Sequence, residues 1–292
     1  MTSTWMALDA WCATQGLARP RKMPGDHLSV ELNGQGGRIH LTLGSYQAKW
    51  DGIQFWLGSQ PRARSGELLL HHLDLEKHIH PLLFPQKTLS PVSRIVVIDP
   101  GHGGDNPGTR SVSFAAYEKT YSLDWARRLA PLMAANGWQV FLTRTNDVAL
   151  APSNRVAFAA SMKADLFLSL HFNSVTGHPE QHGVETYALT PQGMPSHVLR
   201  ESHESSDVRF PGNAHDDENF LAAIRVQQSL LQTTGATDRG VRHARFMGVL
   251  RGQTCPAILI EAGYLSSPRE STAIARVDYR QKLAEAVAGA FP

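Results

Sequence analysis

Four side chains that can bind a metal ion or transfer protons stand next to predicted strand or helix ends. Three follow apolar runs typical of buried strands, and one opens a predicted helix after a loop; they are His102, His171, Glu261 and Glu118. Carboxyl ends of parallel strands share one sheet edge, so we expect the four to lie close together. Two neutral imidazoles and one carboxylate, with water in the fourth position, form a known catalytic zinc set, which leaves one carboxylate to act on water. Together the four favour a metal site.

Each of the four residues has a structural alternative when it is taken singly. His102 could cap a glycine turn, and His171 could be a hydrogen-bonded core histidine. Glu118 could stabilise a helix N-terminus through the helix dipole, and Glu261 could belong to an ion pair. A carboxylate directly after four apolar strand residues is harder to explain structurally, because burying it without a partner is costly and raises its pKa.

A sharp turn is predicted after the first of these strands. The β-branched run Ile95–Ile98 leads into Pro100 and then into three glycines around His102. Proline cannot donate to a strand ladder, so Pro100 is not expected to continue the strand. Glycine adopts backbone angles that other residues avoid, so His102 is expected on a tight turn at the sheet edge.

The composition is that of an ordinary globular protein. The chain has 292 residues, 42% of them hydrophobic and 18% charged, which is enough for a sizeable core in two domains. The 28 basic and 26 acidic residues give a net charge of +2, which argues against nucleic acid or an anionic membrane as partner. No apolar run approaches the roughly 18 residues of a membrane span.

Cysteines, most histidines and the N-terminal residues point to no function. Cys12 and Cys255 lack the paired spacing of a thiolate zinc site. Most of the 14 histidines are expected to carry no function, including a group predicted to lie on the surface, namely His71, His72, His78 and His80. The N-terminus has no basic region followed by an apolar one, so the protein is either not exported or has lost its signal peptide.

Residues 1–84 are predicted to form a small α+β domain. A helix is expected from Trp5 to Gln15, followed by short strands at 27–30, 38–43 and 54–57 that glycines separate. Residues 85–92 are predicted to be a linker, because Pro85 and Pro91 each fix φ and lack a backbone donor.

Residues 93–292 are predicted to form a second domain in which strands and helices alternate. The expected strands are 95–98, 138–143, 166–170, 184–188 and 257–260, and the expected helices are 119–136, 151–162, 220–231 and 278–290. This order is typical of an α/β fold with a mainly parallel mixed sheet flanked by helices. Residues 191–214 are expected to form a long irregular loop that covers or lines the site, because loops above about 15 residues are usually functional or disordered.

The second domain resembles the zinc-dependent N-acetylmuramoyl-L-alanine amidases, peptidoglycan hydrolases with a zinc-peptidase-like α/β fold. The similarity covers about residues 93–292 and rests on six ordered blocks. They are residues 98–104, 118–119, 143–147, 169–174, 183–186 and 261–266, and residues 239–242 and 249–251 fit as well. Six blocks in the same order argue against a chance match.

The resemblance implies a role for each of five residues. His102, Glu118 and His171 would bind one Zn2+ per chain, Glu261 would be the catalytic carboxylate, and Asn173 would contact the substrate. The implied reaction is hydrolysis of the amide between N-acetylmuramic acid and L-alanine, in cell-wall remodelling, septum cleavage or recycling. Peptidoglycan is the implied partner, a protein activator stays open, and the implied location is the periplasm or the extracellular envelope.

Other matched positions are interpreted as structural. Arg144, Asp147 and Arg155 fall at a strand exit or inside a helix, while Glu185 lies in a strand and could also line the groove. Tyr264 replaces a more usual phenylalanine and adds a hydroxyl. Some family members hold an autoinhibitory helix where residues 191–214 stand, but the composition here predicts none.

Residues 41–45 and 50–57 resemble the small domain found at the N-terminus of copper amine oxidases. This resemblance rests on patterning and transfers no catalytic residue, so it implies a wall-binding or spacer role for residues 1–84. Two other functions stay open for the whole chain. One is a zinc hydrolase of the same fold that cleaves another amide, and the other is a catalytically silent wall-binding or activator protein.

Overall fold

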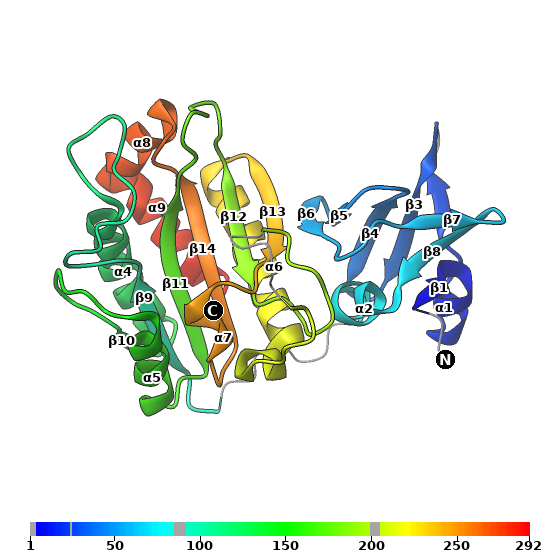
Figure 1. The fold of residues 1–292 in the computed structure, drawn as a ribbon, viewed down its shortest axis with the longest axis horizontal. Coiled ribbons are helices and arrows are strands. Elements are labelled where there is room, and N and C mark those ends of the chain that lie inside the picture. The colour runs from blue at the N-terminus through cyan, green and yellow to red at the C-terminus, as the bar shows by residue number, and fades with distance from the viewer. Residues whose placement is uncertain (1–3, 24, 85–91, 199–204) are drawn as a thin grey trace.

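The computed structural model describes residues 4–23, 25–84, 92–198 and 205–292, and it contains one large and one small sheet (Figure 1). The predicted linker lies outside the described residues except for Val92. Part of the predicted loop 191–214 also lies outside them. The domain boundary at the linker therefore stays a prediction.

The large sheet has eleven strands within the described residues and is mixed. In spatial order they are β10 (Gln139–Leu142), β9 (Ile95–Pro100), β11 (Leu166–Asn173), β14 (Ala257–Tyr264), β12 (Val184–Ala188), β13 (Asp238–His243), β6 (Ile53–Trp56), β5 (Gln47–Trp50), β4 (Gly37–Thr42), β3 (Asp26–Gly34) and β2 (Arg21–Met23). The first four are parallel, β12 runs antiparallel to β14, and β13 is parallel to both β12 and β6. The predicted α/β fold with a mainly parallel mixed sheet is confirmed for residues 93–292.

Alternating residues of the central strands form two buried layers. One layer, with Val96 and Ile98, packs against α4 (Glu118–Ala135), α6 (Asp216–Thr234) and α9 (Val277–Gly289). The other layer, with Val97 and Leu259, packs against α5 (Pro152–Ser161) and α7 (Gly248–Arg251). Helix α8 (Pro268–Ala275) follows β14 and contacts α9. No helix in the described residues is both long and apolar enough to cross a membrane.

The helices and strands predicted for residues 93–292 are all present, with ends that shift by up to four residues. Pro100 ends β9 and pairs with Leu170, contrary to the prediction that it would not continue the strand. The missing proline donor is tolerated at this last position because Gly101 N donates to the Leu170 carbonyl at 3.0 Å. Strand β13 was not predicted, because its charged and glycine residues give no apolar alternation.

The N-terminal part forms an α+β unit that differs from the prediction at its start. Residues 5–7 form a strand, so the helix expected from Trp5 begins only at Leu8. The small sheet has the order β1 (Trp5–Ala7), β8 (Glu67–His71) and β7 (Arg62–Arg64). The helical elements are α1 (Leu8–Thr14), α2 (His72–Asp74), the π-helix η1 (Leu75–Ile79) and α3 (His80–Leu83).

Strand β6 of this N-terminal unit joins the large sheet by pairing with β13. Phe55 stands opposite Val241 in the register, and its ring packs 5.7 Å from that of Phe220 in α6. The backbone N–H of Gln54 donates to the carboxylate of Asp238 at 2.8 Å. Residues 4–84 thus extend the sheet that carries the candidate site (Figure 1).

The loop predicted at 191–214 is irregular in its described parts until the 3₁₀ helix η2 (Pro211–His215) begins. The prediction is therefore wrong for its last residues, where Pro211 starts a helical turn. His197 of this loop interacts with the carbonyl of Leu57 at 3.0 Å, and it accepts from the N–H of His243 at 2.9 Å. Through His197 the loop thus contacts both Leu57, the residue after β6, and strand β13.

His78 is buried, contrary to the prediction that it belongs to a surface group. Its side chain is 0% exposed, and its Nδ1 lies 2.9 Å from Oδ1 of Asp74, one helical turn earlier. Its ring lies 4.9 Å from that of His243, which in turn lies 5.5 Å from the ring of His197. The helical periodicity of residues 72–83 turns Asp74 and His78 to the inside, where Asp74 accepts from the N–H groups of Gly58 and Ser59 and His78 packs against His243 of β13.

The free energy of unfolding is expected to fall as the pH drops below about 6.5. Burial and the nearby charge of His78 lower the pKa of His197 to about 3, and burial also lowers the pKa of His243. Between these folded-state values and the unfolded value near 6.5, only the unfolded chain binds the protons, so acid destabilises the fold by about 1.4 kcal/mol per pH unit for each histidine. Urea unfolding at pH 7, 6 and 5 measures this slope.

A His243→Gln variant should show a shallower slope, by about 1.4 kcal/mol per pH unit. His178→Gln, at an exposed position, should keep the slope of the unmodified protein. An unchanged slope in His243→Gln would show that this buried group does not control acid stability.

Candidate metal centre

The turn after β9 brings the backbone close to the site. His102 has a φ of 61°, in the left-handed region that residues other than glycine rarely adopt. An added Cβ at Gly101 would overlap the ring of His171, and one at Gly108 would lie 2.6 Å from the carboxylate of Glu118. Glycine is therefore required at both positions to leave room for these side chains.

Two buried arginines donate hydrogen bonds to the backbone carbonyls of this turn. Arg155 donates to the carbonyls of Pro100 and His102, both at 2.8 Å, and forms an ion pair with Asp99 at 2.6 Å. Arg144 donates to the Pro100 carbonyl at 3.0 Å, and burial lowers its pKa to about 10, so it stays charged at neutral pH. The arginines therefore fix the backbone of the turn that carries His102.

Glu118 is the first residue of α4 and is 3% exposed. One of its carboxylate oxygens accepts from the N–H of Thr109 at 3.1 Å, and the other accepts from the N–H of Phe172 at 3.1 Å. These backbone donors from a loop and from β11 fix the carboxylate in place. A carboxylate at a helix N-terminus is also favoured by the helix dipole.

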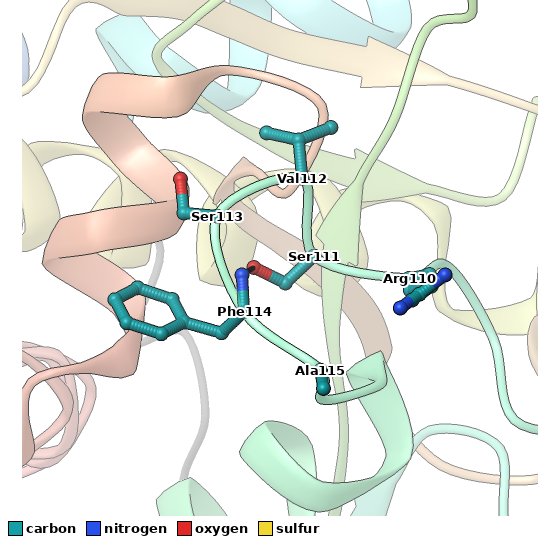
Figure 2. Close-up of a pocket in the computed structure, with 6 residues that line it drawn as sticks. All are labelled: Arg110, Ser111, Val112, Ser113, Phe114 and Ala115. Atoms are coloured by element: carbon teal, nitrogen blue, oxygen red, sulfur yellow. Dashed lines mark hydrogen bonds between the residues drawn. The ribbon is translucent and has the colours of Figure 1, made fainter.

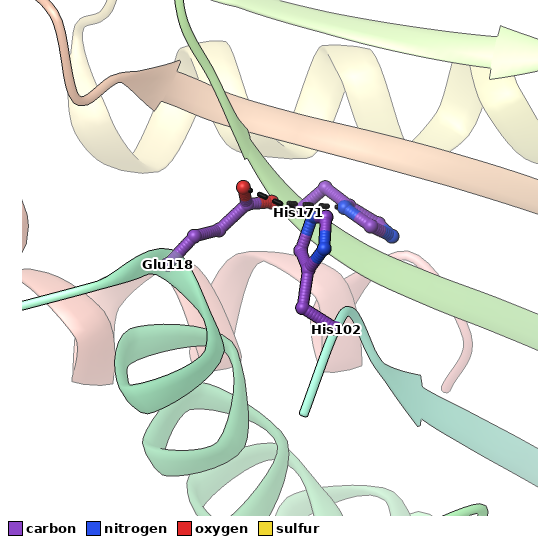
Figure 3. A group of neighbouring side chains, drawn as sticks. All are labelled: His102, Glu118 and His171. Carbon is purple, nitrogen blue, oxygen red and sulfur yellow. Dashed lines mark hydrogen bonds and ion pairs between the residues drawn. The ribbon is translucent and has the colours of Figure 1, made fainter. Parts of the chain in front are cut away.

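The structure brings three of the four predicted side chains together (Figure 3). Nε2 of His102 lies 3.0 Å from Oε2 of Glu118, and Nδ1 of His171 lies 2.9 Å from Oε1. One potential ligand atom from each residue lies within 4.8 Å of the others. This geometry corresponds to a possible metal-binding triad at the carboxyl ends of β9 and β11.

The charges of these side chains stabilise one another. Burial would raise the pKa of Glu118, but hydrogen bonds from His102 and His171 outweigh it and hold that pKa well below its usual range. Burial lowers the pKa of His102, but the hydrogen bond and charge of Glu118 outweigh it, so this pKa is raised. The buried negative charge that raises the pKa of His102 would also attract a cation.

The donor set fits a zinc ion. Two imidazoles and one carboxylate match a known catalytic zinc set, which keeps one coordination position for water or substrate. Nδ1 of His102 lies 3.0 Å from Oδ1 of Asn106, which fixes the ring with Nε2 toward Glu118. Asn106 was not predicted as a site residue, because it lies in an irregular loop whose residues show no periodic pattern.

Glu261 lies on β14 directly opposite His171 in the parallel register with β11. Paired residues of neighbouring strands point to the same face, so the Glu261 side chain lies beside the triad. Asn173 ends β11, and its Nδ2 donates to Oε1 of Glu185 at 2.6 Å. The structure thus places Glu261 and Asn173 on the sheet edge that carries the triad.

Glu185 lies at the centre of a polar network on β12. It stands opposite Glu261 in the antiparallel register with β14 and is 2% exposed. The hydroxyl of Tyr264 donates to its Oε1 at 3.0 Å, so the hydroxyl that distinguishes Tyr264 from phenylalanine has a partner. Burial and the charge of Glu185 raise the pKa of this hydroxyl, which therefore stays protonated.

A separate hollow lies in the loop between β9 and α4, lined by residues 110–115 (Figure 2). The loop is fixed by Val112 N, which donates to the Leu265 carbonyl at 3.0 Å, and by Ser113, whose hydroxyl lies 2.5 Å from that of Ser271. None of the triad residues lines this hollow. Residues 110–115 therefore support the sheet edge, and none of them is a triad residue.

A family model described as N-acetylmuramoyl-L-alanine amidase matches residues 96–291. The N-acetylmuramoyl-L-alanine amidase AmiC of Neisseria meningitidis serogroup B is 31% identical over 214 residues, which cover 66% of this chain and 51% of that protein. LytC of Bacillus subtilis, an enzyme with the same description, is 30% identical over 196 residues, which cover 67% of this chain and 34% of LytC. The chain therefore spans about half, or less, of these curated relatives.

Solved structures agree with this assignment. The catalytic domain of CwlV, an N-acetylmuramoyl-L-alanine amidase from Bacillus (Paenibacillus) polymyxa, is 31% identical with a TM-score of 0.55, and the match covers 68% of this chain and 95% of that domain. An N-acetylmuramoyl-L-alanine amidase from Clostridium difficile 630 is 30% identical with a TM-score of 0.57 over the same shares. With the family model, these matches confirm the predicted membership: the chain belongs to the N-acetylmuramoyl-L-alanine amidase family.

Proposed function

We propose that the chain hydrolyses the amide between N-acetylmuramic acid and L-alanine in peptidoglycan, with one zinc ion held by His102, Glu118 and His171. The observation that carries this function is the triad itself, with its ligand atoms within 4.8 Å in a chain of the amidase family. A zinc ion supplies Lewis acidity toward a carbonyl oxygen and lowers the pKa of water.

Glu261 is the proposed general base and acid. It would accept a proton from the attacking water and return it to the amine of L-alanine as the amide bond breaks. Its position opposite His171 supports this role, because a proton carrier must lie within hydrogen-bond reach of the reacting water. Asn173 is the proposed substrate contact, since it lies at the same edge and is partly exposed.

The proposed substrate also sets the proposed location. Peptidoglycan lies in the bacterial envelope, so we propose that the protein acts in the periplasm or at the extracellular envelope, in cell-wall remodelling. A wall-binding or spacer role is proposed for residues 1–84.

Digestion of purified peptidoglycan tests this function. The protein is expected to release stem peptides with a new L-alanine amino terminus, identified by mass spectrometry. A chelator should abolish release and added zinc should restore it, because the zinc ion would polarise the carbonyl and lower the pKa of the attacking water. New amino termini at another residue would identify a hydrolase of a different amide. Intact peptidoglycan with full zinc occupancy would identify a silent wall-binding protein.

A further inference from the structure

A line of polar and aromatic side chains crosses the sheet from the candidate metal centre to the N-terminal unit. Glu185 on β12 stands opposite Glu261 on β14. Arg242 on β13 pairs with the residue two positions after Glu185, so it points to the same face. Phe55 on β6 pairs with Val241 on β13. The next residue on β6, Trp56, therefore stands beside Arg242 and points to the same face.

Two arginines face one carboxylate in this line. Nε of Arg242 lies 3.1 Å from Oε2 of Glu185, and Nε of Arg239 lies 3.7 Å from the same oxygen. The other oxygen of Glu185 already accepts from Asn173 and Tyr264. Glu185 therefore lies between two guanidinium groups, and Glu261 on the neighbouring strand is the other carboxylate of this line.

Arg242 retains unused donors. Within the described residues its hydrogen bonding is limited to Nε, which donates to the carbonyl of Arg239 at 3.4 Å. Among the residues that the structure describes, neither terminal amino group has an acceptor, and the side chain is 16% exposed. A planar guanidinium with two free amino groups matches the geometry of a carboxylate.

Trp56 of the N-terminal unit holds Arg242 in place. The guanidinium carbon of Arg242 lies 4.3 Å from the centre of the Trp56 ring, a cation–π contact. The indole N–H donates to the carbonyl of Arg239 at 3.2 Å, and Nε2 of Gln54 donates to the same carbonyl at 3.3 Å. A residue outside the family match thus sets the plane of an arginine within it.

We propose that Arg242, with Arg239 beside it, binds a carboxylate of the peptide on the leaving side of the scissile amide, and that Trp56 is a positioning residue for Arg242. Strand β13 is two strands away from β14, which carries Glu261. Because neighbouring strands lie about 4.8 Å apart, the distance between β13 and Glu261 is about 10 Å, which a peptide of about three extended residues spans. The carboxylate subsite rests on the proposed amidase function, because the peptide in question is that of the muramoyl substrate.

Two matched substrates test the subsite: an N-acetylmuramoyl tripeptide with free carboxylates, and the same compound with its carboxylates amidated. The zinc-loaded protein should cleave the free acid with about tenfold higher kcat/KM, mostly through KM, as expected for a charged hydrogen-bonded pair. Arg242→Gln should cleave the two substrates with about equal kcat/KM and should keep its zinc. Arg242→Lys should keep part of the preference for the free acid. Trp56→Leu should give an intermediate preference, because Arg242 remains but is less constrained.

Arg64→Gln, on β7 of the small sheet, is the matched control and should keep the full preference. Equal cleavage of both substrates by the unmodified protein, or an unchanged preference in Arg242→Gln, would exclude the subsite. Calorimetric binding of both tripeptides to Glu261→Gln separates the subsite from turnover. If neither compound is cleaved by the unmodified protein but the free acid still binds through Arg242, the amidase function fails and the subsite stands.

Discussion

Glu261→Gln is expected to lower kcat for hydrolysis of the muramoyl-L-alanine amide by about 10²- to 10⁴-fold, the usual contribution of general acid–base catalysis. Glutamine keeps the size and polarity of the side chain but cannot accept and return the proton. Glu261 lies beside the triad and is not one of its three residues, so the variant should bind zinc as the unmodified protein does. Initial rates on a soluble muramoyl peptide, with zinc content measured in the same samples, check both expectations.

Glu285→Gln is the matched control, because it removes a carboxylate from the exposed face of α9. That variant should keep normal turnover. Near-normal turnover in Glu261→Gln would show that another group carries the proton. Zinc loss in that variant would instead identify Glu261 as a ligand.

His102→Ala is expected to weaken zinc binding by more than about 100-fold, since loss of a group that only orients a ligand already costs about 10- to 100-fold. The remaining Glu118 and His171 leave the ion with too few protein ligands for a catalytic site. Elemental analysis after dialysis against a weak chelator measures occupancy, and circular dichroism checks the fold.

Two further variants make this prediction sharper. His171 lies in strand β11 and has no positive φ, so His171→Ala should lose zinc without the backbone strain that the positive φ of His102 adds. Asn106→Ala removes the contact to Nδ1 of His102 and should weaken binding by about 10- to 100-fold. Full zinc in His102→Ala and His171→Ala would mean that the proposed ligand set is wrong.

The sequence by itself determined the alternation of strands and helices in residues 93–292 and the strand ends that carry the site. These features are local: apolar runs such as Leu166–Leu170 predict strands, and the residue that follows must lie at the sheet edge. Parallel pairing then brings His102, His171 and Glu261 to one edge, since carboxyl ends of parallel strands meet there. Chain order and pattern therefore predicted that these side chains share one sheet edge, whereas the choice of His102, Glu118 and His171 as the ligands came from the family resemblance.

Only the tertiary structure decided which distant segments pair across the sheet. Nothing in the local pattern of Ile53–Trp56 shows that this strand adds to β13, or that Trp56 lies on the guanidinium of Arg242. His78 was expected at the surface as one of a group of four histidines, yet it is buried against His243 of β13. Such pairings depend on shape and burial between residues far apart in the chain, and periodicity within one segment carries no information about them.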